Sequence, residues 1–101
     1  MGLSFDTIRR RMSGMQIELL EKAALLMEEC ASSKDLKKQY KKLAKKLKKG
    51  KDLESQEQGL LSIGLIALAQ AIRRDVENGG SELTIDNAET LESMAKDILS
   101  W

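Results

Sequence analysis

Few side chains in this sequence could carry out a reaction. Histidine, the side chain that most often transfers protons near neutral pH and the commonest metal ligand, is absent. The single cysteine, Cys30, cannot build a zinc site by itself. Neighbouring carboxylates such as Glu28 and Glu29 point apart on a helix, and Gly79-Gly80 is not a phosphate-binding glycine loop. We therefore expect a protein that is not an enzyme, with no metal site and no cofactor.

The sulfur-containing residues fit a hydrophobic core better than a reactive site. Cys30 continues a helical stripe with Leu19, Ala23 and Leu26, so we interpret it as a small apolar core residue and not as a reactive thiol. Four of the five methionines also follow apolar stripes and are interpreted as core residues that fill gaps: Met12, Met15, Met27 and Met94.

The strongest chemical signal is a run of lysines. The segment 34–51 holds ten lysines and one aspartate, a local charge of +9, whereas the whole chain carries +1. This run could be a solvated helix face, or it could bind phosphates, anionic lipid or an acidic protein. The predicted basic surface consists of Lys37, Lys38, Lys41, Lys42, Lys45, Lys46, Lys48 and Lys49.

Specific nucleic-acid recognition is not expected from this run. The segment has no arginine for bidentate base contacts, and Tyr40 is its only aromatic residue for stacking on bases. A general attraction to negative surfaces, including the inner leaflet of a membrane, remains open. The triplet 9–11 is either a second basic site or a solvated helix end.

The elements that position these residues are predicted to be helices. Proline is absent and helix-forming residues dominate, which favours an all-α domain spanning 1–101. Apolar periodicity predicts helices at about 5–31, 34–49, 53–78 and 85–100. Ser4 or Asp6 is expected to cap the first helix, which Ser13-Gly14 could bend, and Ser32-Ser33 to end it and cap the next. The other expected signals are Gly50 as a stop and Asp52 and Thr84 as N-caps.

Short connections make neighbouring helices antiparallel, so we predict an antiparallel up-down-up-down four-helix bundle. The segment 59–69 is apolar around nearly the whole helix, and further helices or a partner must cover the excess. No signal peptide is visible, and the apolar stretch 60–72 is shorter than the roughly 20 residues that span a membrane. A cytoplasmic location is expected.

The second half of the chain shows a recognisable order of motifs. Leu60-Leu61-Ser62 opens a helix that ends in Ile72-Arg73-Arg74-Asp75, before a glycine turn at Gly79-Gly80 and a last helix capped by Thr84. In this order the chain resembles the cytosolic immunity proteins that protect bacteria from pediocin-like (class IIa) bacteriocins. In the first half, the basic turn 9–11, the stretch 17–20 and the lysine-rich segment ending near Gly50 fit more loosely.

This resemblance implies an antiparallel four-helix bundle that works without catalysis. Such an immunity protein binds the membrane components of the mannose phosphotransferase system, with bacteriocin bound, from the cytosolic side and blocks the pore. Peripheral association with the inner membrane face is a separate expectation, from the lysine run. The family's C-terminal half determines which bacteriocin is resisted. The resemblance therefore suggests these partner-binding candidates: Gly79, Gly80, Ser81, Thr84 and Trp101.

Two other functions remain open at this stage. The first is a nucleic-acid-associated small helical subunit of a defence complex, which would place the lysines of 34–51 on a phosphate backbone. The second is a small helical adaptor or phage-type inhibitor, which would use the apolar segment 59–69 to associate with other chains.

Overall fold

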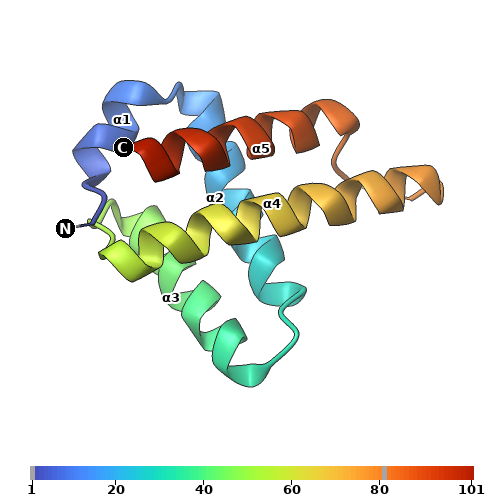
Figure 1. Ribbon diagram of the computed structural model, residues 1–101, viewed down its shortest axis with the longest axis horizontal. Coiled ribbons are helices and arrows are strands. Elements are labelled where there is room, and N and C mark those ends of the chain that lie inside the picture. Colours follow the sequence, from blue (N-terminus) through green and yellow to red (C-terminus); the bar gives the residue numbers. More distant parts are fainter. Residues whose placement is uncertain (1, 81) are drawn as a thin grey trace.

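Helices make up nearly all of the chain. The computed structural model describes residues 2–80 and 82–101, and these form five helices: α1 (Phe5–Arg11), α2 (Gly14–Glu29), α3 (Lys34–Lys49), α4 (Ser55–Glu77) and α5 (Ile85–Ser100) (Figure 1). The prediction of an all-α fold is confirmed. The number of helices is five and not four.

The extra helix arises from a break at Ser13, so the prediction of one helix over 5–31 is wrong. Met12 is extended, and Ser13 starts α2 with a capping box. The Ser13 hydroxyl accepts from the backbone N–H of Gln16 at 3.2 Å, and the Gln16 side chain accepts from the backbone N–H of Ser13 at 2.9 Å. These two bonds provide partners for polar groups at the start of a new helix. The chain therefore forms two separate helices here and not one bent helix. Met15, predicted to be core, is 82% exposed.

The remaining boundaries agree with the sequence except at Asp52. Helices at 34–49 and 85–100 are confirmed, with Ser33 and Thr84 as N-caps and Gly50 in the left-handed conformation (φ 69°). Asp52 does not cap α4, which begins at Ser55. Its carboxylate accepts instead from the backbone N–H of Phe5 at 2.9 Å, the first residue of α1.

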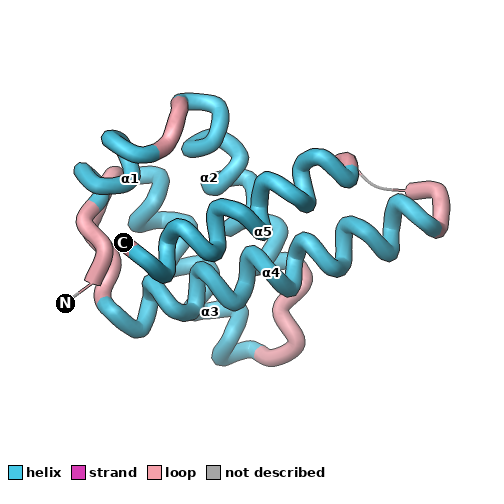
Figure 2. Tube along the Cα trace, turned by 45° about the horizontal axis from the view of Figure 1, so that its top comes forward, coloured by secondary structure: helices cyan, strands magenta, loops and turns pink. Residues whose placement is uncertain are grey.

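The N-terminal segment is tied to the connection between α3 and α4. Leu3 and Leu53 exchange two backbone hydrogen bonds of 2.8 Å, and both side chains are buried. Figure 2 shows this segment running beside the start of α4, with the chain's C-terminus near α1. Residues 52–53, predicted to begin a helix, thus hold the chain's first residues in place.

The four longer helices form two antiparallel pairs. α4 and α5 run side by side in opposite directions, and α2 passes behind them and across their direction, with α3 returning beside it (Figure 1). The molecule measures 39 × 31 × 21 Å. Each pair is antiparallel, but the two pairs cross, so the predicted antiparallel up-down-up-down four-helix bundle is not confirmed.

Two side chains link α4 to the backbone of α5. The hydroxyl of Ser62, fully buried, donates to the carbonyl oxygen of Ala95 at 2.8 Å. Gln58 donates through Nε2 to the carbonyl oxygen of Ile98 at 2.6 Å. The carbonyl oxygens of α5 normally accept hydrogen bonds only within their own helix. Here two of them also accept from Ser62 and Gln58, whose polar groups would otherwise be buried without partners. They fix the register of the pair.

Gly64 lets α4 approach α2 and α3 closely. A Cβ at this position would lie 2.5 Å from Cε of Met27 and 3.2 Å from Cε1 of Tyr40. Both neighbours are core residues, Met27 from α2 and Tyr40 from α3. The absence of a side chain at position 64 thus sets the distance at which the two helix pairs meet.

We predict that Gly64→Leu destabilises the protein by at least about 2 kcal/mol, because the added side chain overpacks the junction with Met27 and Tyr40. Urea unfolding followed by circular dichroism measures the change. Gly59→Leu is the matched control, since a Cβ there meets nothing within 4 Å and helix propensity improves. Equal unfolding free energies for the two variants would contradict the close approach.

Candidate functional site

The lysines of α3 lie on the outer side of that helix. We call seven of them, all exposed, the lysine face: Lys37, Lys38, Lys41, Lys42, Lys45, Lys48 and Lys49. The opposite side of α3 is buried through Tyr40, Leu43, Ala44 and Leu47. Because this buried stripe orients the helix, the ammonium groups must point away from the core. The lysine face, from Lys37 to Lys49, extends along roughly 18 Å of helix.

Lys46 differs from the rest of the predicted basic surface. Its ammonium lies 2.6 Å from Oε1 of Glu57 on α4, and the two side chains are only 20% and 13% exposed. The same carboxylate oxygen accepts from the backbone N–H of Glu54 at 2.9 Å. Lys46 therefore joins α3 to the first turn of α4 and is not free to meet a partner.

The environment of Glu57 favours its charged form. Burial raises the pKa of Glu57, but the Glu54 backbone N–H and the Lys46 ammonium both donate to the carboxylate, and Lys42 adds positive charge nearby. Together these interactions outweigh burial and hold the pKa below its ordinary value of 4.5.

None of the seven side chains of the lysine face forms an ion pair in the described part of the chain, although Lys42 lies near Glu54 and Glu57. Within residues 2–80 and 82–101 the other ion pairs are Lys22 with Glu82 at 3.9 Å and Arg73 with Glu92, neither of which involves α3. The excess negative charge of the remaining chain thus lies elsewhere on the molecule. A surface with seven unpaired ammonium groups attracts anions from solution.

One arginine of the predicted basic triplet adjoins the C-terminal end of α3. Arg9 stacks on the Phe5 ring at 5.0 Å, and its guanidinium lies beside Gly50, where a Cβ would be 3.5 Å from it. A cation at this place also suits the negative end of the α3 dipole. All three arginines of the triplet are exposed, and the stack on Phe5 holds Arg9 at that helix end.

The structure does not bring the C-terminal candidates together. Gly79, Gly80 and Thr84 are exposed at the α4–α5 turn, and the Thr84 hydroxyl accepts from the backbone N–H of Asn87 at 3.2 Å. Ser81 lies outside the described residues. Trp101 lies at the other end of α5, about 24 Å away along the helix, where its ring meets Arg11 at 6.0 Å. The turn and Trp101 cannot form one compact site.

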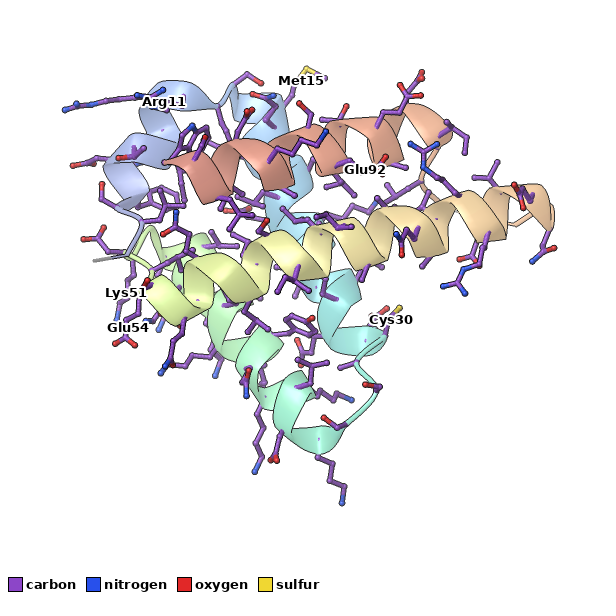
Figure 3. All side chains as sticks on the ribbon, in the orientation of Figure 1. Arg11, Met15, Cys30, Lys51, Glu54 and Glu92 are labelled. Carbon is purple, nitrogen blue, oxygen red and sulfur yellow. The ribbon has the colours of Figure 1, made fainter. Side chains whose placement is uncertain are left out.

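Cys30 is exposed, so its prediction as a core residue is wrong. It follows the end of α2 at Glu29, where the chain leaves the helix and the apolar periodicity no longer sets the direction of the side chain. Figure 3 shows it at this end of α2. Cys30 lies between two shallow grooves of about 270 and 170 Å³, both also lined by Leu68 and Ala71 of α4. Sequence reasoning missed these grooves because they form only where helices distant in sequence meet.

Two further properties concern the described residues only. No group of three or more cysteine and carboxylate side chains there is placed to hold a metal ion. None of the helices in those residues combines the length and the apolar character needed to cross a lipid bilayer. Comparisons with protein-family models, curated proteins and solved structures found no match for the chain.

We predict that Glu57→Gln destabilises the protein by about 1 kcal/mol near neutral pH and has a smaller effect at an acid pH well below 4.5. A lowered pKa means that the carboxylate contributes stability above pH 4.5 and loses it as pH falls through the folded-state pKa. Urea unfolding at both pH values measures the difference. Glu18→Gln, which removes an exposed carboxylate on α2, is the control. A pH-independent effect of Glu57→Gln would contradict this coupling.

Proposed function

We propose that this chain protects a bacterium from a pediocin-like bacteriocin by binding the receptor complex from the cytosolic side of the membrane. The partners are the membrane components of the mannose phosphotransferase system with bacteriocin bound. Binding is stoichiometric and needs no catalytic turnover. The protein works in the cytoplasm and associates peripherally with the inner membrane face.

The lysine face is the observation that carries this proposal. Anionic headgroups attract each lysine near the surface by about 1 kcal/mol, so seven ammonium groups on one helix favour residence at the inner leaflet. Lysine suits this role because its flexible stem lets each charge find a headgroup without fixed geometry. A protein held at that surface is concentrated beside its membrane receptor.

The resemblance in the second half supports the same role. The helix from Leu60 to Asp75, the glycine turn and the capped last helix follow the order of the family. The antiparallel up-down-up-down four-helix bundle that the resemblance implies is part of this proposal. The turn at 79–84 and Trp101 would contact the receptor separately, since they lie at opposite ends of α5.

The nucleic-acid alternative uses the same lysines but has less support. Tyr40 is the only aromatic residue of α3, and it is buried against α4, so no ring on that helix is available to stack on bases. Phosphate contact alone would remain, and it would show as RNA binding that weakens steeply with salt. Strong binding to RNA, with no protection against any bacteriocin, would favour this alternative.

We predict that the chain, expressed in a bacterium sensitive to pediocin-like peptides, protects the cells, so that at least one peptide must be about tenfold more concentrated to kill them, a shift on the order of one decade. A panel of such peptides in a growth-inhibition assay measures the effect. Unchanged killing across a broad panel would remove the proposal.

We also predict that Lys41→Glu with Lys45→Glu abolishes binding to vesicles with anionic lipid and reduces protection, because it reverses two charges at the middle of the lysine face. Vesicle co-sedimentation at several salt concentrations measures binding. The matched control, Lys22→Glu with Lys96→Glu, changes the net charge equally on α2 and α5. Equal losses in both double variants would show that net charge alone matters.

A further inference from the structure

The outer side of α4 is apolar and uncovered. It consists of Gly59, Ile63, Ile66, Ala67 and Gln70, which we call the α4 strip. Ile63 is 67% exposed and Ile66 36% exposed, whereas the inner residues Leu61 and Leu65 are fully buried. α2, α3 and α5 therefore cover only part of the circumference of this apolar helix. Of the two ways predicted to cover the apolar excess, further helices or a partner, the helices of this chain leave this side uncovered.

The strip is uncharged along its whole length. Residues 58–72 contain no charged side chain, and the helix between Gly59 and Gln70 extends roughly 17 Å. Leu99, 59% exposed, adds apolar surface near one end, because the bond from Gln58 to the Ile98 carbonyl places the end of α5 there. The centre of a protein interface is depleted in charge in the same way.

Opposite charges stand at the two ends of α4. Glu54 precedes the first turn and Arg74 lies in the last turn, both exposed and equidistant in sequence from Gly64. Figure 3 shows Glu54 at the N-terminal end of α4, away from the α4–α5 turn. The charges at the ends of α4 therefore match those of a second α4 that runs in the opposite direction. A second α4 turned end for end would place its Glu54 opposite Arg74 and its Arg74 opposite Glu54.

We propose that the α4 strip binds a second copy of this chain, with the two α4 helices antiparallel about a two-fold axis near Gly64. Ile63 of one copy then packs on Ile66 of the other, twice, as a two-fold interface requires. The charged ends form two identical pairs. Self-complementarity of both the apolar centre and the charged ends selects a second copy over an unrelated partner.

The apolar strip provides the affinity and the charges set the orientation. Lys42 lines the same groove as Glu54, so it competes with the second copy's Arg74 for that carboxylate. Exposed pairs of this kind discriminate between arrangements more than they strengthen binding. The proposed contact involves only α4 and the end of α5 of each copy, so its buried area is small for a protein interface. We therefore expect a dimer that dissociates at micromolar concentration.

Sedimentation equilibrium of the full chain over two decades of concentration tests the proposal, with reducing agent present because exposed Cys30 could otherwise cross-link copies. We expect a concentration-dependent dimer. Ile63→Glu should weaken it by about tenfold or more, because the new carboxylate would be buried without a partner. The matched control, Leu25→Glu, changes a side chain that is 56% exposed on α2 and should leave the dimer intact. Circular dichroism checks that both variants fold.

A charge swap tests the antiparallel arrangement. Arg74→Glu and Glu54→Arg should each weaken the dimer severalfold, and the double variant should regain most of the loss because the two pairs are restored in reverse. A monomer at every concentration, or a dimer insensitive to Ile63→Glu, overturns the proposal. Failure of the double variant to recover overturns the antiparallel arrangement.

Discussion

The packing of α4 is the constraint on which the rest of the structure depends. Its inner side meets α2 and α3 closely at Gly64 and bonds to the backbone of α5 through Ser62 and Gln58. Residues just before α4 hold the N-terminal segment through Leu53. A helix that is apolar around most of its circumference can be stable in water only when several neighbours cover it, and here the two helix pairs cross at α4 to do so.

Core packing also decides where the positive charges of α3 lie. In α3 the leucines and Tyr40 occupy one side, so the lysines can only lie on the other, and the core decides the direction of the charged surface. A single ion pair, between Lys46 and Glu57, joins that helix to α4. The rest of the positive charge remains available for an anionic partner, and this explains how a chain with a net charge of +1 can present a strongly basic face.

The two proposals use different sides of the molecule. The lysine face belongs to α3, and the α4 strip belongs to the outer side of α4. A dimer would place two lysine faces in one assembly, so attraction to an anionic membrane would grow through avidity. The interface and the membrane contact can be disrupted separately, because Ile63 and Lys45 lie on different helices. Neither surface requires a catalytic group.

The sequence by itself determined the helical class, the two helices 34–49 and 85–100, and the basic run, because these depend on local periodicity and capping, as Ser33, Gly50 and Thr84 show. Only the tertiary structure decided the roles of Asp52, Lys46 and Cys30, since each depends on which distant segment lies beside it. Asp52 accepts a hydrogen bond from the first backbone N–H of α1, Lys46 pairs with Glu57, and Cys30 lies outside the core where α2 ends. The break between α1 and α2 at Ser13 combines both kinds of information. The capping box of Ser13 is a local sequence signal, but the apolar stripe of 5–31 continues through it. The stripe taken alone predicts one helix, and the structure has two.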